Sequence, residues 1–349
     1  MSDDDACPVP ASRYSHVVLG HGSGGRLGHD LLHDVFLAGF GAHGPDARED
    51  ASTVRVDALS RIAVTTDAFV VHPRTFPGGD LGSLAVYGTV NDLAVAGARP
   101  EWLTAAFILE EGLPIEELRA IVESMRIACE RAHVVLVAGD TKVVDRGKGD
   151  GVFVTTTGVG RIPEGRALSA RNAQPGDVVL VSGTMGDHGV AVMSARLGLE
   201  LEGALASDAA PIHELCDALL AAAPNVRCMR DPTRGGLAAA LNELASASAV
   251  QIELDESHVP VNDAVRGACE ILGIDPLYVA NEGKLVAIVP EASSDAALAA
   301  LRAHPLGQDA ARVGRVVPPT GSNPVIVHTA LGTQRVLPLL SGEALPRIC

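Results

Sequence analysis

Arg61-Ile-Ala-Val-Thr-Thr-Asp67 is typical of a strand that delivers an aspartate at its C-terminal end. A glycine-containing loop with a second aspartate follows, Phe76-Pro-Gly-Gly-Asp80, and leads into a helix that we predict over residues 81–96. This helix carries Asn91 and Asp92. A strand, an acidic loop and a helix in succession predict an α/β domain.

Strands and helices are predicted on both sides of this stretch. In the first half we expect strands at 51–56, 101–109, 133–142 and 151–160, and an amphipathic helix at 114–132. In the second half we expect strands at 177–183, 250–254, 285–289, 325–328 and 335–339, helical sequence from 186 to about 224, and a helix at 237–247. The class is therefore α/β, or α+β, throughout.

The length of the chain predicts two domains, because 349 residues exceed what one hydrophobic core usually supports. Ile162-Pro-Glu-Gly165 is typical of a linker between them. We divide the chain into a glycine-rich arm (1–45), a first α/β domain (46–165), a second domain (166–320) and C-terminal strands with a tail ending in Cys349 (321–349).

Composition excludes some classes of partner. The formal charge is −16 and the pI is about 5.1, which argues against a nucleic-acid groove or a patch for anionic membranes. The six cysteines form no Cys-x-x-Cys pair and no zinc-like spacing, as expected of reduced thiols. The acidic start, Met1-Ser-Asp-Asp-Asp5, and the lack of a long apolar run predict a cytoplasmic protein.

A glycine-rich turn near the N-terminus contains Gly20, Gly22, Ser23, Gly24, Gly25 and Arg26. It satisfies G-x-G-x-x-G formally, but only three apolar residues precede it and no ribose-binding acid follows in a βαβ unit. It also lacks the Gly-Lys-Ser/Thr of a Walker loop. We interpret it as a flexible turn whose backbone N–H groups could close over phosphates, with a plain surface turn as the alternative.

Six oxygen-bearing side chains each lie at a strand end, in a glycine loop or near the start of a helix: Asp67, Asp80, Asn91, Asp92, Asp140 and Asp231. Such oxygens are what Mg²⁺ and a triphosphate need. For any one aspartate the simpler explanation is a helix cap or a turn. Together they predict a shared metal and phosphate site, which would let an acidic protein bind an acidic nucleotide.

The chain ends in Leu345-Pro-Arg-Ile-Cys349. A thiolate is a strong nucleophile near neutral pH, and a chain end can move between partners. Pro346 stiffens the approach, and Arg347 could hold the thiol as thiolate. The alternative is that Cys349 is the last residue of a frayed end.

Several motifs together resemble the HypE family of hydrogenase maturation factors, from about residue 16 to the end. They are His21-Gly-Ser-Gly-Gly-Arg26, Thr65-Thr-Asp67, Pro77-Gly-Gly-Asp80, Gly88-Thr-Val-Asn-Asp-Leu-Ala-Val-Ala-Gly97, Ala138-Gly-Asp-Thr-Lys-Val-Val144, Gly186-Asp-His-Gly189, Met229-Arg-Asp-Pro-Thr-Arg-Gly-Gly236, Ala280-Asn-Glu-Gly-Lys284 and the terminal Pro-Arg-Ile-Cys. Aminoimidazole ribonucleotide synthetase and selenophosphate synthetase share several of these pieces. The terminal Pro-Arg-Ile-Cys separates the HypE family from them.

The resemblance implies a PurM-like fold and a defined reaction. The first domain would form a barrel-like homodimer core, the second a split α/β unit, with ATP in the cleft. HypE proteins receive a carbamoyl group on the terminal cysteine from HypF. They use ATP to dehydrate this thiocarboxamide to a thiocyanate, and the cyanide passes to iron on the HypC–HypD complex for [NiFe] hydrogenase.

Roles follow for the residues at these motifs. Mg²⁺ would be held by Asp67, Asp80, Asp92, Asp140 and Asp231, with Asn91 as a neutral ligand or orienting group. Glu282 is the candidate base, with capping a turn or pairing with Lys284 as alternatives. Lys142 would stabilise the transferring phosphate or share proton transfer, unless it is an ordinary exposed lysine.

Four further residues complete the predicted nucleotide site: Thr141, His188, Arg234 and Gly235. Arg234 and the following glycines at a helix N-terminus suit an anion, and His188 either assists or caps its helix. Arg347 could guide the tail by pairing with an acid. Two other functions remain open: an ATP-dependent synthetase acting on a diffusible small molecule, and a scaffold that carries a thiol-bound group beside a vestigial ATP site.

Overall fold

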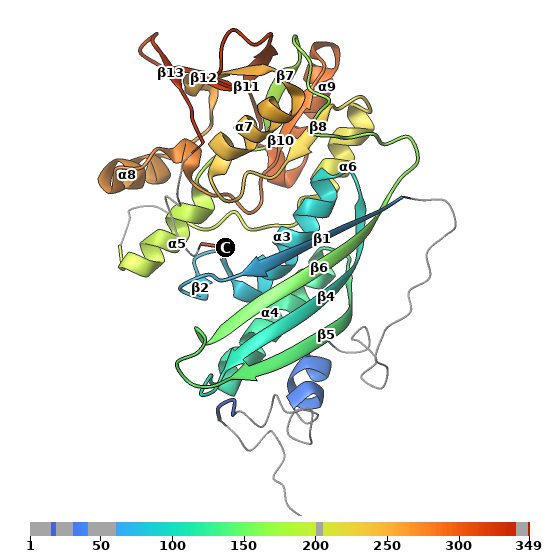
Figure 1. Cartoon of the computed structure of the whole chain (residues 1–349), viewed down its shortest axis with the longest axis vertical. Coiled ribbons are helices and arrows are strands. Elements are labelled where there is room, and N and C mark those ends of the chain that lie inside the picture. The colour runs from blue at the N-terminus through green and yellow to red at the C-terminus, as the bar shows by residue number, and fades with distance from the viewer. Residues whose placement is uncertain (1–14, 19–30, 41–60, 200–204, 340–347) are drawn as a thin grey trace, which may run out of the picture.

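The computed structural model describes residues 15–18, 31–40, 61–199, 205–339 and 348–349 (Figure 1). The predicted strand at 51–56, the glycine turn with Gly22, Ser23, Gly24, Gly25 and Arg26, and Arg347 lie outside these ranges. In the described parts, no helix is both long and apolar enough to cross a membrane.

The first domain is built on a four-stranded sheet in the order β1-β6-β4-β5. Its strands are β1 (Arg61–Phe69), β6 (Val152–Ile162), β4 (Arg99–Glu110) and β5 (Val135–Val144). Only the β4–β5 pair is parallel. A two-stranded hairpin, β2 (Thr75–Phe76) and β3 (Gly79–Asp80), leads into the first long helix. This sheet is open at both edges, so the described part of the first domain does not form a closed barrel.

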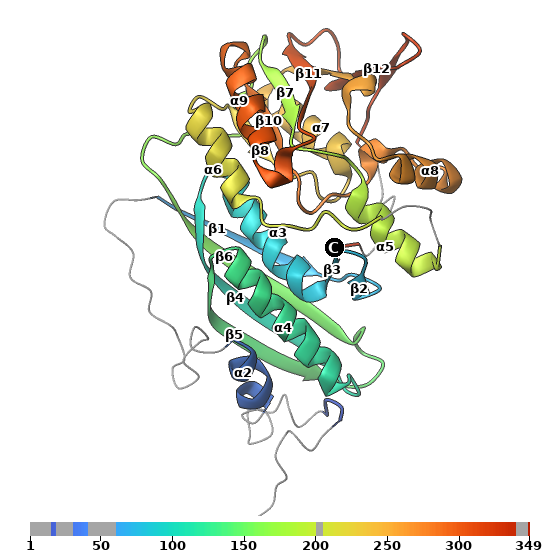
Figure 2. The ribbon, with the colours of Figure 1, turned by 180° about the vertical axis from the view of Figure 1, so that it is seen from behind.

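Two helices cover one face of this sheet, α3 (Leu81–Val95) and α4 (Ile115–Arg131) (Figure 2). Helix α4 has one apolar face, whereas nearly all of α3 is buried, including Thr89 and Asn91. A helix buried all round must be covered on every side. The sheet and α4 cover α3 on one side and the second domain, through α6, covers the other.

The opposite face of the first sheet has no covering element among the described residues (Figure 1). Val64 on β1 is 64% exposed and Ile108 on β4 is 43% exposed, although both are β-branched and apolar. Successive side chains of a strand point to opposite faces, so Asp67 on β1 faces the helices while Val64 faces outward.

The second domain contains a seven-stranded sheet in the order β13-β12-β9-β11-β7-β10-β8. Its strands are β7 (Val178–Val181), β8 (Cys228–Arg230), β9 (Gln251–Asp255), β10 (Val286–Val289), β11 (Ala311–Val317), β12 (Val325–His328) and β13 (Gln334–Val336). The central strands β7 and β10 are buried at every residue because helices pack on both faces. The two runs predicted near 325 and 335 thus join this sheet as β12 and β13.

The helices of this domain are α5 (Asp187–Leu197), α6 (His213–Ala222), α7 (Gly236–Ser248), α8 (Asp263–Leu272) and α9 (Glu291–Ala303). Helix α7 packs on one face, and α6 and α9 pack on the other. The short elements are η3 (Leu32–Leu37), α2 (Ala38–Phe40), η5 (Glu256–His258), η6 (Pro276–Tyr278) and η7 (Pro305–Gly307).

The helical sequence predicted from 186 to about 224 is interrupted. Residues 205–212, which we call the strap, are extended and cross between the two domains (Figure 1). The backbone N–H of Ser207 donates to the carbonyl of Pro77 at 2.7 Å, and that of Ile212 donates to Asn91 Oδ1 at 2.9 Å. Pro211 has no N–H to give a helix, and these longer-range bonds replace the helical ones.

Candidate active site

Two of the predicted carboxylates meet between β1 and α3. Asp67 Oδ2 accepts a hydrogen bond from Thr89 Oγ1 at 3.0 Å, and Asp92 Oδ2 accepts one from Thr65 Oγ1 at 2.7 Å. Each acid is therefore held by a threonine of the opposite element. The arrangement fixes both carboxylates side by side at the junction of strand and helix.

Asp231 completes an acidic group with Asp67 and Asp92. Burial raises the pKa of Asp67 to about 6, and the charge of Asp92 is the next cause. Burial likewise raises the pKa of Asp231 to about 7, again with Asp92 second. The positive charge of the Arg234 guanidinium lowers the pKa of Asp67, so Arg234 lies near these three acids. Mutual repulsion of this kind is relieved by a bound cation.

This acidic group suits Mg²⁺. The ion prefers hard oxygen ligands and binds through one or two carboxylates plus water and phosphate oxygens. Across the described ranges, no three His, Cys, Asp or Glu side chains are already gathered in a metal-binding arrangement. The pair Asp67 and Asp92 therefore fits an ion that takes the rest of its shell from a nucleotide.

Glu282, which belongs to the second domain, lies close to Asp67, Asp92 and Asp231. Its side chain is 2% exposed, and Oε1 has no hydrogen-bond partner among the described residues. Burial raises its pKa well above the ordinary range, followed by the charges of Asp231 and Asp208. A carboxyl group with a raised pKa is a strong proton acceptor once ionised, which suits a general base.

The backbone of Glu282 is clamped from both sides. Asn91 Nδ2 donates to the carbonyl of Glu282 at 2.9 Å and to that of Ala210 at 3.0 Å. Asp208 accepts from the N–H of Glu282 at 3.1 Å and pairs with Lys284 Nζ at 3.3 Å. Lys284 thus pairs with Asp208, and the amide of Asn91 is used to orient Glu282. No sequence signal marked Asp208, which follows an alanine-rich stretch without a motif.

The last two residues of the chain lie at this site (Figure 1). Ile348 is 3% exposed, and its carbonyl accepts a hydrogen bond from His188 Nε2 at 2.6 Å. The N–H of Val70 donates to the terminal Cys349 O at 3.1 Å. Val70 follows directly after β1, three residues beyond Asp67. These last two residues are therefore docked beside the acids.

Both ring nitrogens of His188 are engaged in this docking, since Nδ1 bonds Ser207 Oγ at 2.8 Å. The ring is completely buried and packs edge-on against Phe76 at 5.4 Å between centroids. His188 was predicted in the nucleotide site or as a helix cap. In the structure its hydrogen bonds go to the tail and to the strap.

Asp80, Asp140 and Lys142 are not brought to this group within one chain. Asp80 caps the N-terminus of α3, accepting from the N–H of Ser83 at 2.9 Å, and twelve residues of helix place it about 18 Å from Asp92. The alternative of a helix cap therefore holds for Asp80.

Asp140 lies across the sheet from β1. It is level with Ala106 on β4, which pairs with Thr155 on β6, which pairs with Ala68 on β1. Three strand spacings separate it from β1 by about 14 Å. Ala68 points away from the face that carries Asp67, so Asp140 projects from the outer face. Lys142, two residues on, shares that face, and Thr141 points inward. A single six-oxygen site is thus not formed by one chain.

The start of α7 supplies an anion-binding position beside the acids. Gly235 caps the helix at φ +78°, and Gly236 follows at φ +61°. A Cβ at Gly236 would lie 2.6 Å from the carbonyl of Val279, so only glycine fits there. Arg234 is exposed just before this N-terminus. Backbone N–H groups and a guanidinium at one point suit a phosphate.

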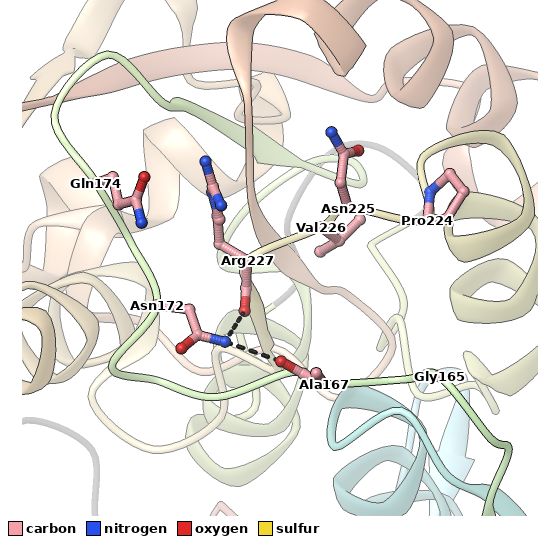
Figure 3. A pocket seen from close by; sticks show the side chains of 8 residues that line it. All are labelled: Gly165, Ala167, Asn172, Gln174, Pro224, Asn225, Val226 and Arg227. Carbon is pink, nitrogen blue, oxygen red and sulfur yellow. Dashed lines mark hydrogen bonds between the residues drawn. The ribbon is translucent and has the colours of Figure 1, made fainter.

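Two hollows flank the Asp208–Lys284 pair, with volumes of about 470 and 350 Å³. A third hollow of about 310 Å³ lies on the second domain, between the interdomain linker and the loop before β8 (Figure 3). There Asn172 Nδ2 donates to the Ala167 carbonyl at 2.8 Å, and Arg227 pairs with Asp177 at 3.3 Å. Its polar groups serve the protein itself, so we do not assign this hollow to the site.

Comparison with known proteins agrees with this geometry. Residues 48–162 match the family model for the N-terminal domain of AIR synthase related proteins, and residues 174–326 match that for the C-terminal domain. The chain is 53% identical over 331 residues to the carbamoyl dehydratase HypE of Cupriavidus necator, covering 95% of this chain and 94% of that protein. The chain belongs to the HypE family.

Solved structures of HypE proteins have the same fold. One in complex with ATP is 46% identical, with a TM-score of 0.91, covering 95% of this chain and 99% of the other. HypE in a HypE–HypF complex is 44% identical, with a TM-score of 0.77, covering 89% and 99%. The predicted fold class and the predicted HypE family are thus confirmed.

Proposed function

We propose that this chain dehydrates a carbamoyl group carried on its own Cys349, using ATP, and so makes a thiocyanate whose cyanide serves [NiFe] hydrogenase. The observation that carries the proposal is the docked chain end. Cys349 is held by Val70 next to Asp67, and Ile348 is buried. Conversion of a diffusible substrate would not require the protein's own C-terminus in this place.

The reaction needs two things from the residues around the tail. The amide oxygen of the thiocarboxamide is a poor leaving group, so it must first accept the γ-phosphoryl group of ATP and then depart as phosphate. The nitrogen must give up two protons as the C≡N bond forms. The balanced outcome is a thiocyanate, ADP and phosphate from a thiocarboxamide and ATP.

Each side chain has a place in this scheme. Glu282 takes a nitrogen proton, since it is buried, unpartnered at Oε1 and clamped by Asn91 and Asp208. Asp67 and Asp92 would hold Mg²⁺, with Asp231 beside them. When bound, that ion neutralises charge on the phosphates during in-line transfer. Arg234 and the N-terminus of α7 would bind a phosphate.

We further propose a homodimer formed on the outer face of the first sheet, in which strands of two chains complete a barrel-like core. Val64 and Ile108 support this, because both are large apolar side chains exposed on the same uncovered face of the sheet. Asp140 and Lys142 project from the same face, so a second copy is the route by which they would join a site. Lys142 would then stabilise the transferring phosphate.

We infer HypF as the carbamoyl donor, supported by the related HypE–HypF complex. The HypC–HypD complex would accept the cyanide. A cytoplasmic location suits these partners, and it is supported by the free thiols of Cys129, Cys216, Cys228 and Cys269.

Intact-mass measurement tests the function. The protein is incubated with HypF, a carbamoyl donor and ATP, and we expect a carbamoyl mass to be gained and then one water to be lost, with ADP formed. Cys349→Ala should abolish both changes, whereas Cys7→Ala, the thiol control, should not. ATP turnover with a small molecule that survives Cys349→Ala would favour a synthetase instead. ATP binding without turnover would favour a scaffold.

A further inference from the structure

We infer that His188 is a positioning residue that holds the C-terminal tail in the site through the carbonyl of Ile348, and that Ser207 locks the imidazole for this task. The inference deepens the proposed function and rests on it for its catalytic consequence. The docking itself is a property of the fold and is measured without any reaction.

The hydrogen bonds fix the protonation state of the ring. A backbone carbonyl can only accept, so His188 Nε2 carries the proton that it gives to Ile348 O at 2.6 Å. Burial lowers the pKa of His188, so the ring is neutral and Nδ1 is an acceptor. The hydroxyl of Ser207 then donates to Nδ1 at 2.8 Å, and its oxygen accepts from the N–H of Ala209 at 3.1 Å. Every donor in this set of hydrogen bonds therefore meets an acceptor.

The imidazole has little freedom to turn away from the tail. It is fully buried, Phe76 packs edge-on against it, and the N–H of Ser207 is anchored to Pro77 at 2.7 Å. A donor with a fixed direction binds a carbonyl with little loss of side-chain entropy. His188 therefore offers a preformed hydrogen-bond donor to the carbonyl of Ile348, and the N–H of Val70 offers a second donor one residue later.

The strap links this docking to the candidate base. Ser207 holds His188, and the next residue, Asp208, holds the N–H groups of Glu282 and Gly283 at 3.1 and 3.3 Å. Two consecutive residues thus orient the tail and Glu282 together. The expected consequence is that removal of His188 slows dehydration because the thiocarboxamide spends less time beside Glu282.

The test measures how often the tail leaves. Carboxypeptidase Y requires a free, extended chain end, so the rate at which it removes Cys349, followed by intact mass, reports the undocked fraction. We compare wild type with His188→Leu, which fills the space without a donor, and with His188→Gln, whose amide can donate to Ile348 and accept from Ser207. Loss of one neutral hydrogen bond should raise the rate about fivefold in His188→Leu. His188→Gln should stay within about twofold of wild type.

The matched control is His213→Leu. His213 is a half-buried histidine of the second domain whose two ring nitrogens are buried but have no hydrogen-bond partner in the described residues. This variant should leave the carboxypeptidase rate unchanged. If His188→Leu does not fold, Ser207→Ala carries the test, with an expected rise of two- to threefold because only the orientation of the ring is relaxed.

An unchanged rate in folded His188→Leu, or an equal rise in His213→Leu, would overturn the inference. Because the assay uses neither ATP nor a carbamoyl donor, it can succeed even if the proposed reaction is wrong. Conversely, if the His188→Leu variant dehydrates its thiocarboxamide at the wild-type rate, the proposed function stands. The positioning role of His188 would then be wrong.

Discussion

Replacement of Asn91 by leucine should destabilise the protein and stop dehydration together. The side chain is 1% exposed and makes three hydrogen bonds across the domain boundary, to the carbonyls of Ala210 and Glu282 and from the N–H of Ile212. Leucine has a similar volume and leaves these three groups buried without a partner. Each such group costs about 1–3 kcal/mol, so we expect a loss of about 3–9 kcal/mol in the free energy of unfolding.

The assay is urea unfolding followed by the fluorescence of Trp102, the single tryptophan, which lies on β4. For the expected loss the midpoint should fall by about 1 M or more. The dehydration rate, measured at low urea where the variant is folded, should also fall, since the carbonyl of Glu282 is no longer held.

The control is Asn242→Leu. Asn242 is equally buried, on α7, and its Nδ2 donates to the carbonyls of Ala238 and Leu337, both at 2.8 Å. Ala238 lies four residues earlier in the same helix, so the helix itself supplies its carbonyl with a partner. Only Leu337 loses its donor, and the cost should be about 1–3 kcal/mol with dehydration retained. Equal destabilisation by the two variants, with full activity in Asn91→Leu, would refute the reasoning.

Four further predictions follow from the same geometry. Metal-free protein should lose stability as the pH rises from 5 to 8. The pKa values of Asp67 (about 6) and Asp231 (about 7) lie above their unfolded values, and a carboxyl group with a raised pKa stabilises the fold only while it is protonated. Thermal melts with and without Mg²⁺ check this, and Mg²⁺ should reverse the trend. Glu282→Gln should abolish the loss of water from the carbamoylated protein while nucleotide binding, measured by calorimetry, persists. A few residues added after Cys349 should slow dehydration at least tenfold and leave ATP binding unchanged, because the terminal oxygen is already bonded inside the site; an extended protein that dehydrates normally would contradict the docked geometry. Val64→Lys should convert a dimer into a monomer in sedimentation. A wild-type protein that already sediments as a monomer would exclude the proposed interface.

The fold was largely predictable because its strands and helices have strong local signals. The strands at 61–67 and 151–160 and the helices at 81–96 and 114–132 appear within a few residues of the expected bounds, as β1, β6, α3 and α4. Helices α8 and α9 and strand β11 were missed. The strap was taken for helix because its alanine-rich composition favours one, and only its bonds to Pro77 and Asn91 make it extended.

The chain itself determined which chemical groups are available. Motifs placed Asp67, Asp92 and Asp231 at element ends and put a thiol at the last position, since residue type and local spacing are properties of the sequence. Only tertiary structure decided which of these groups meet. A strand alternates its side chains between two faces, so Asp140 and Lys142 turn outward while Asp67 turns inward. A half-buried strap with no motif supplies Ser207 and Asp208. Contacts between residues far apart in sequence have no local signal, so the docking of Ile348 on His188, 160 residues away, could be found only in the fold.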